Sequence, residues 1–306
     1  MKVAVTGSTG LIGSALVPHL RERGHDVVRF VRGTPAGADE RSWDPGRRRL
    51  DPADLADVDA VVHLAGAGVG DKRWTGSRKA VVLGSRVDGT TAVAEAVAAS
   101  DRTRVLLSAS AVGFYGDTGD RLTDETGASG KGFLAEVCRQ WEAATGPAER
   151  ADTRVVHLRT GIVLAGEGGA LGPQLPVFRA GLGAPLGSGR QYVPWISLPD
   201  EVRAVEHLLT ADVSGPVNLV APAPVTNREF TKVLGRVLNR PTLPVPVPGF
   251  VLKAALGGFA GEGVLVGQRL APAVLERSGF RFSHTGLEQA LRAVLGRPAE
   301  PPVRPG

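Results

Sequence analysis

The stretch that decides the fold is Thr6-Gly7-Ser8-Thr9-Gly10-Leu11-Ile12-Gly13. It follows an apolar run at residues 3–6 and opens a segment with helical spacing at residues 11–23. A glycine triplet in this context lets the chain turn sharply, leaves room for a pyrophosphate and lets the helix pack closely on the sheet. Unpaired N–H groups at the helix N-terminus attract phosphates. The sequence therefore predicts a dinucleotide-binding loop formed by Gly7, Ser8, Thr9, Gly10, Leu11, Ile12 and Gly13.

Apolar runs and helical patterns alternate through the first half of the chain. The expected strands are residues 3–6, 27–31, 60–64, 105–108 and 155–158, and the expected helices include residues 11–23 and 86–99. Strands that alternate with helices of this length are typical of a parallel, doubly wound sheet. We therefore predict an α/β protein built on a Rossmann-type doubly wound parallel sheet.

Glycine and proline interrupt the second half, most densely at residues 161–194. The patterns beyond it predict a helix at 199–210, a strand at 215–220 and helical segments at 250–259, 268–278 and 285–295. We expect a cofactor-binding domain over residues 1–165, with segments near 190–225 as candidates to rejoin it. A smaller mixed α/β substrate lobe is expected over residues 166–296, with a helical part at 249–296. The proline-rich residues 297–306 are expected to form a disordered tail.

The charge and cysteine content exclude several classes of protein. The 306 residues carry a net charge of +5 that is spread along the chain, and the densest run, Arg47-Arg48-Arg49, has no interleaved aromatic residues. We therefore expect no nucleic-acid partner, although a basic field favours an anionic small-molecule ligand. The single cysteine, Cys138, fits a reducing compartment. Without a signal peptide, a long apolar span or a metal-binding pattern, we expect a cytoplasmic monomer or homodimer.

The end of the second expected strand predicts which dinucleotide binds. An enzyme that uses NAD usually places Asp or Glu there to accept hydrogen bonds from the ribose hydroxyls. Here the strand ends in Val31-Arg32-Gly33, and no carboxylate follows until Asp39. Arg32 is placed to pair with a 2′-phosphate, and its guanidinium can stack on adenine. The sequence therefore predicts NADP(H) as the cofactor.

Several longer motifs carry a resemblance to a known family. They are residues 6–13, 63–66, 71–74, 108–116, 133–142, 158–164 and 185–191. With these motifs the chain resembles the extended short-chain dehydrogenase/reductases. Within them it is similar to an atypical subfamily that resembles NAD-dependent epimerases and dehydratases and ends in a domain of unknown function. The segment from about residue 250 to 295 resembles that closing domain.

The resemblance implies further contacts with the cofactor. Leu64, Ala65 and Gly66 would lie under the adenine ribose and the pyrophosphate, while His63 would be a packed strand residue. Arg86 takes the place of an asparagine that the family usually has on its helix. Ser108 would lie at the cofactor. The segment that contains Arg159 and Gly161 would line the nicotinamide side.

The same resemblance shows where the usual catalytic pattern breaks. Working enzymes of this superfamily use a serine or threonine, a tyrosine that exchanges a proton with the substrate, and a lysine four residues later. Ser110 is our first choice for the serine, and Ser108 is the second. Alignment on Glu142 places Leu134 at the tyrosine position and Cys138 at the lysine position. Leucine cannot exchange a proton, and a neutral thiol cannot lower the pKa of a neighbour as an ammonium does.

Three other side chains are candidates for the missing chemistry. Tyr115 follows the serine strand where the chain leaves the sheet, and Lys72 lies in a loop that could face an anionic substrate. Cys138, the lone thiol, has no cation or histidine beside it in sequence, so we interpret it as a buried structural residue. Two functions stay open: an oxidoreductase or epimerase-like enzyme acting on a small polar or sugar-like substrate, and a non-catalytic NADP(H)-binding sensor or interaction module.

Overall fold

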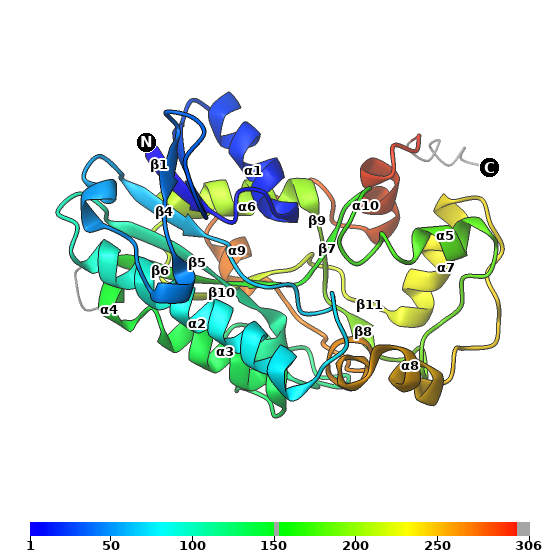
Figure 1. The fold of residues 1–306 in the computed structure, drawn as a ribbon. Helices are drawn as coiled ribbons and strands as arrows, with labels where there is room; N and C mark the ends of the chain where they lie inside the picture. Colours follow the sequence, from blue (N-terminus) through cyan, green and yellow to red (C-terminus); the bar gives the residue numbers. More distant parts are fainter. Residues whose placement is uncertain (150–152, 299–306) are drawn as a thin grey trace.

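A seven-stranded parallel sheet organises the molecule, which we describe from a computed structural model for residues 1–149 and 153–298 (Figure 1). The strand order is β10-β6-β5-β4-β1-β2-β3, so the chain winds outward from β1 in both directions. This order confirms the predicted doubly wound sheet. The strands are β1 (Lys2–Thr6), β2 (Asp26–Val31), β3 (Glu40–Ser42), β4 (Ala60–His63), β5 (Val105–Ala111), β6 (Arg154–Thr160) and β10 (Gly215–Leu219).

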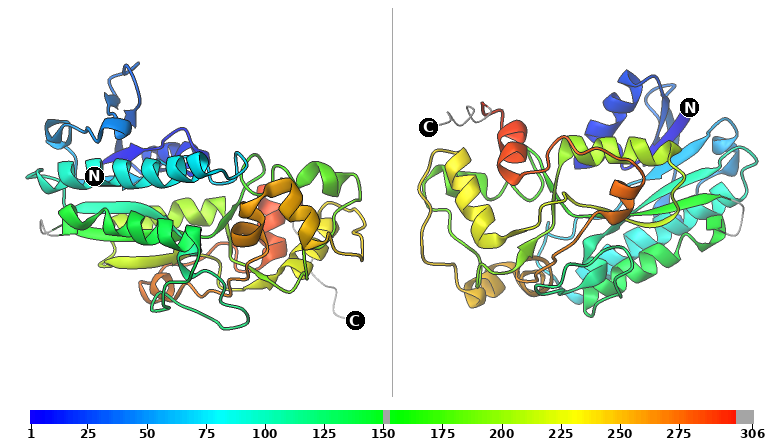
Figure 2. Two further views of the ribbon diagram at one scale, coloured as in Figure 1. Left: turned by 60° about the horizontal axis from the view of Figure 1, so that its bottom comes forward. Right: turned by 180° about the vertical axis from the view of Figure 1, so that it is seen from behind.

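Helices cover both faces of this sheet. On one face, α1 (Leu11–Glu22) packs beside α6 (Leu198–Thr210), as the right view of Figure 2 shows. On the other face, α2 (Gly76–Ala98) packs against α3 (Phe133–Ala143) and α4 (Gly146–Glu149). Short 3-10 helices connect these layers: η1 (Pro45–Arg47), η2 (Pro52–Leu55) and η3 (Val112–Tyr115).

The apolar runs in the sequence form strands because both of their faces are buried. Val3 and Val5 point into the core beneath α1 and α6, while Ala4 between them points into the core beneath α2. All three are fully buried. A strand buried on both sides reads as an unbroken apolar run rather than an alternating one.

A smaller lobe extends from the carboxyl end of the sheet and lies on the right of Figure 1. Its core gathers buried residues from helices and short strands, among them Trp195, Phe178, Phe230 and Leu291. Its elements are β7 (Ile162–Leu164), α5 (Leu175–Arg179), β8 (Tyr192–Val193), β9 (Trp195–Ser197), β11 (Val225–Thr226), α7 (Asn227–Val237), α8 (Gly249–Leu256), the π-helix η4 (Ala260–Val264) and α10 (Leu287–Val294). A further short helix, α9 (Ala273–Arg277), packs on β10.

Two helices begin five or more residues away from the expected position. The helix expected at 86–99 begins ten residues earlier, at Gly76, because the Thr75 side chain accepts a hydrogen bond from the Arg78 N–H and caps it. The helix expected at 268–278 is reduced to Ala273–Arg277, because Pro272 cannot continue a helix toward its N-terminus. Of the tail expected to be disordered, residues 299–306 lie outside the described residues. No helix among the described residues is long and apolar enough to cross a membrane.

Candidate functional site

A cavity of about 750 Å³ lies at the carboxyl ends of β1, β2 and β4. Residues 7–10 of the glycine loop form one wall, and residues 64–68 after β4 form another. Arg32, at the end of β2, also lines the cavity. The structure thus brings residues 7–10, Arg32 and residues 64–66 together, while Leu11 and Ile12 pack against the core at the start of α1. The other predicted cofactor residues do not line this cavity: Gly13, Arg86, Ser108, Arg159 and Gly161.

Two of the loop glycines are required by close packing. Gly7 has a φ of 67°, and a Cβ atom there would lie 2.8 Å from the Leu64 carbonyl carbon. A Cβ atom on Gly13 would lie 2.2 Å from the Gly7 carbonyl oxygen. Because any larger side chain would push α1 or β4 away from the loop, these positions hold the helix N-terminus against the cavity.

Arg32 presents a free positive charge to this cavity. Its side chain is exposed, and it makes no ion pair with any residue that the structure describes. The first carboxylate after β2, Asp39, is held away by Arg21 and Arg29, whose guanidinium nitrogens lie 2.5 and 3.2 Å from its Oδ2. The cavity therefore offers a cation, and no carboxylate from Asp39, where a ribose hydroxyl or 2′-phosphate would lie.

His63 is a structural residue beneath the cavity. Its Nδ1 lies 2.7 Å from the Thr6 hydroxyl and its Nε2 lies 3.1 Å from the Thr90 hydroxyl. Thr6 Oγ1 also accepts the backbone N–H groups of Leu64 and Ala65. Burial lowers the pKa of His63 to about 4, so the ring is neutral at physiological pH. This bridge between β1, β4 and α2 fixes the floor of the cavity.

Arg86 of α2 lies behind one wall of the cavity and is not among its lining residues. Its guanidinium donates to the Ala67 and Val82 carbonyl oxygens and stacks over Trp141 on α3 at 4.7 Å. The same side chain packs behind Gly66, where a Cβ atom would lie 3.5 Å from the guanidinium carbon. Arg86 is buried and therefore shapes the segment from Leu64 to Ala67 from behind.

Three other predicted site residues meet in a buried polar network beyond β5. Ser110 donates to Glu142 at 2.7 Å, and Arg159 donates to both carboxylate oxygens of Glu142 at 2.8 Å. Arg159 also donates to the Tyr115 hydroxyl at 2.9 Å, and that hydroxyl donates to Asn218 at 2.7 Å. Neighbouring register on β5 and β6 places Ser110 beside Arg159. The network ties α3 to three strands of the sheet.

Burial and pairing set the protonation states in this network. Burial alone would raise the pKa of Glu142, but the Arg159 guanidinium and the Ser110 hydroxyl lower it overall. Burial raises the pKa of Tyr115. The Tyr115 hydroxyl donates its hydrogen bond to Asn218, and the Ser110 hydroxyl donates its hydrogen bond to Glu142. Ser108, the second choice for the serine, is 1% exposed, and its hydroxyl has no partner in the described chain.

The positions of the family's tyrosine and lysine lie on the first turns of α3. A Cβ atom on Gly113 would lie 3.3 Å from the Leu134 Cβ and 3.7 Å from the Cys138 sulfur, so both face η3. The Cys138 thiol contacts the Ala111 carbonyl oxygen at 3.5 Å. Burial raises its pKa to about 12, which keeps the thiol neutral.

Lys72 and Gly161 occupy opposite environments. Lys72 is exposed in the loop between β4 and α2 and has no ion-pair partner in the described chain. Gly161 is packed so tightly after β6 that a Cβ atom would lie 2.3 Å from the Pro194 carbonyl oxygen. Trp74, near Lys72, packs edge-on against Phe133 at the start of α3 and against Phe259 before η4. This cluster joins the loop to the smaller lobe.

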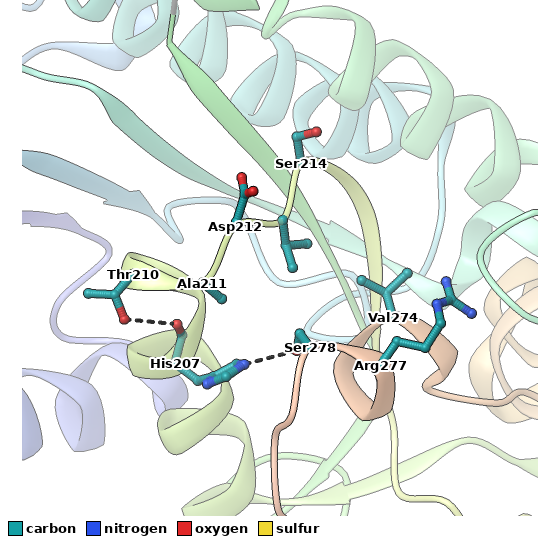
Figure 3. A pocket seen from close by; sticks show the side chains of 9 residues that line it. His207, Thr210, Ala211, Asp212, Ser214, Val274, Arg277 and Ser278 are labelled. Carbon is teal, nitrogen blue, oxygen red and sulfur yellow. Dashed lines mark hydrogen bonds between the residues drawn. The ribbon is translucent and has the colours of Figure 1, made fainter.

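A second cavity, of about 530 Å³, lies before the amino end of β10 (Figure 3). His207 lies 2.9 Å from the Ser278 hydroxyl, which itself donates to the Leu275 carbonyl oxygen. Because that serine proton is already committed, the pair lacks the arrangement of a nucleophile and its base. Ligands of open α/β sheets bind at the carboxyl edge, where the first cavity lies.

Comparison with known proteins identifies the family. Residues 3–135 match the model of the NAD dependent epimerase/dehydratase family, and residues 247–294 match a domain of unknown function. An epimerase family protein of Mycobacterium leprae is 50% identical over 299 residues, which cover 97% of each chain. The human epimerase family protein SDR39U1 is 35% identical over 301 residues, covering 96% of this chain and all of that one.

The chain belongs to this epimerase family. A crystal structure of human SDR39U1 (isoform 2) with NADPH superposes with a TM-score of 0.87 at 33% identity, over 97% of this chain and 99% of that one. The match extends through both the sheet and the smaller lobe. It confirms the resemblance that the sequence motifs indicated.

Sequence reasoning missed three residues that the structure places in contact with the predicted site residues or with the start of α3. In the sequence, Glu142 was used only to align the helix with the family's motif. In the structure it accepts hydrogen bonds from both Ser110 and Arg159. Asn218 was not predicted, although it is fully buried and its side-chain oxygen accepts a hydrogen bond from the Tyr115 hydroxyl. Glu262 comes from the smaller lobe and accepts a hydrogen bond from the Leu134 N–H at 2.9 Å. The sequence offered one indication of these residues: Asn218 is an asparagine within the apolar stretch expected to form a strand at 215–220.

Proposed function

We propose that this epimerase-family protein is an NADP(H)-dependent oxidoreductase or epimerase-like enzyme that acts on a small polar or sugar-like substrate, with a preference for anions. The glycine-loop N–H groups would hold the pyrophosphate, and Arg32 would hold the 2′-phosphate. Residues 64–66 would lie under the ribose, and the segment from Arg159 to Gly161 would line the nicotinamide side. When bound, NADP(H) supplies the hydride exchange that the side chains of this chain cannot supply.

One observation carries the proposed choice of cofactor: Arg32 lines the cavity without an ion-pair partner in the described chain, while Asp39 is occupied by two arginines. A carboxylate near a 2′-phosphate would repel it, whereas an available guanidinium can bind it through two hydrogen bonds. The relative that crystallised with NADPH supports the same cofactor.

Arg32→Ala is expected to weaken NADPH binding by about 10- to 100-fold, because a hydrogen-bonded charge pair contributes about 1.5–3 kcal/mol. NADH binding should change by less than about twofold, since NADH lacks the phosphate that Arg32 would contact. Calorimetric titration of both nucleotides against wild type and variant measures the effect. Arg41→Ala provides a matched control, because Arg41, on β3, is engaged in an ion pair with Asp57. Tighter binding of NADH than of NADPH by the wild type would contradict the proposal.

A non-catalytic NADP(H) sensor is the second candidate, and one observation favours it. The protons of Tyr115 and Ser110 are committed within the protein, and the Cys138 thiol is neutral. A sensor would bind NADPH and NADP⁺ without exchanging hydride with any alcohol or carbonyl compound. Turnover of a panel of nucleoside diphosphate sugars, free sugars and hydroxy acids would exclude it.

A further inference from the structure

The carboxylate of Glu262 crosses from the smaller lobe to the start of α3. Its Oε2 accepts the Leu134 N–H at 2.9 Å. A Cβ atom on Gly132 would lie 2.8 Å from the same oxygen, and Gly132 itself has a φ of 103°. The absence of a side chain at Gly132 is therefore what lets the carboxylate reach the helix.

This contact falls at the edge of the sheet where ligands of such folds bind. Leu134 and Cys138 face η3, which follows directly from β5. The carboxyl edge of a doubly wound sheet is the edge that binds ligands. Leu134 is also the residue that the family resemblance places at the tyrosine position. Glu262 thus brings an ionisable group to the backbone of the residue that stands at the tyrosine position.

The second carboxylate oxygen of Glu262, Oε1, has no hydrogen-bond partner within residues 1–149 and 153–298, and the side chain is half-buried. Three charged groups on the elements packed nearby have contacts with other residues. Lys79 of α2 lies over the Phe133 and Trp74 rings, Arg73 lies against Gly257, and Glu136 of α3 pairs with Arg139. One lone-pair-bearing oxygen is therefore left to accept a proton.

The other candidates for proton exchange are each constrained. Tyr115 and Ser110 donate to Asn218 and Glu142. Cys138 is a neutral thiol bonded to a backbone carbonyl oxygen. Lys72 is an exposed loop residue and makes no ion pair within the described residues. Glu262 is held in place by one oxygen, and its other oxygen has no partner in the described chain and can exchange a proton with a substrate.

We propose that Glu262 is the general acid–base residue of this protein and takes the role of the missing tyrosine. In the oxidation direction, Oε1 accepts the proton of a substrate hydroxyl while the hydride on the same carbon passes to NADP⁺, leaving a carbonyl and NADPH. In the reverse direction, the protonated carboxyl returns the proton to the carbonyl oxygen as NADPH gives the hydride. The proposal rests on the proposed oxidoreductase function.

Two substitutions separate this role from a purely structural one. Glu262→Gln keeps an oxygen that can accept the Leu134 N–H but cannot take up a proton. Glu262→Ala removes both properties. If Glu262 only caps α3, the glutamine variant should keep nearly all of the wild-type activity. The alanine variant should then lower the melting temperature of the protein. A general base loses its activity in both variants.

The experiment screens NADP⁺ reduction and NADPH oxidation by wild type over a panel of nucleoside diphosphate sugars, free sugars, hydroxy acids and their carbonyl forms. With any substrate that turns over, Glu262→Gln should lower kcat by about 100-fold or more, with the KM for the nucleotide unchanged within about twofold. Sodium formate, but not sodium chloride, should partly restore turnover to Glu262→Ala by replacing the lost carboxylate.

Each other outcome overturns a defined statement. Wild-type turnover that persists in Glu262→Gln overturns the role of Glu262 and leaves the oxidoreductase function standing. Wild-type protein that binds NADPH in calorimetry but turns over nothing in the panel overturns both the oxidoreductase function and the role of Glu262. Wild-type protein that fails to bind NADPH overturns the proposed cofactor.

Discussion

Glu142→Ala is expected to lower the free energy of unfolding by about 3–5 kcal/mol, because it leaves the charge of Arg159 buried without a partner. Arg159 is 4% exposed, and Glu142 accepts two of its hydrogen bonds and one from Ser110. Removing the carboxylate leaves all three buried donors without an acceptor, and water has little access to this part of the protein. An unpaired charge in such a place costs far more than the net contribution of the pair.

Urea unfolding followed by circular dichroism measures this change, and a second glutamate on the same helix provides the control. Glu136 pairs with Arg139 at the surface, where both side chains are more than 40% exposed. Glu136→Ala should leave the urea midpoint almost unchanged, because exposed ion pairs are screened by water. Equal effects of the two substitutions would show that Arg159 finds another partner when Glu142 is lost.

The parts of the site that could be predicted from sequence are those that local geometry determines. The glycine loop needs only its own spacing between a strand and a helix. Arg32 follows its strand directly, so the residue at the ribose position could be read without knowing any distant contact. In the structure both line one cavity, with Leu64 to Gly66 as the facing wall.

The buried network could not be predicted, because its contacts join distant parts of the chain. Tyr115 lies 103 residues from Asn218, and Ser110 lies 32 residues from Glu142. From sequence, Tyr115 was only a residue where a strand leaves the sheet, and an exit from the carboxyl edge suggested contact with a ligand. Its actual environment depends on β10, which returns from the second half of the chain to pair with β6.

Glu262 shows the same limit in a stronger form. It lies 128 residues from Leu134 and stands in a glycine-rich π-helix with no periodic pattern to direct attention to it. Only the packing of the smaller lobe against α3 reveals that a carboxylate stands beside the tyrosine position. A catalytic motif can therefore seem incomplete along one helix when the replacing side chain comes from another lobe.

Glu201→Gln is expected to remove a loss of stability with rising pH. Glu201 is fully buried on α6, where Thr160 donates to Oε1 and Oε2 has no partner in the described chain. Burial raises its pKa from 4.5 to about 8. The folded protein thus keeps a proton that the unfolded chain releases near pH 4.5, so wild-type stability falls between those pH values by about 1.4 kcal/mol per pH unit from this group.

Chemical denaturation between pH 5 and pH 9 measures the slope for wild type and Glu201→Gln. The difference in unfolding free energy should grow in favour of the variant to roughly 5 kcal/mol and level off above pH 8.

Glu206→Gln on the same helix provides a control of opposite sign. Burial would raise the pKa of Glu206, but hydrogen bonds from His19 and Arg23 lower it overall. Its contribution is therefore stabilising at neutral pH and is lost on acidification. Parallel pH profiles of wild type and Glu201→Gln would mean that the Glu201 carboxyl is solvated in the folded protein.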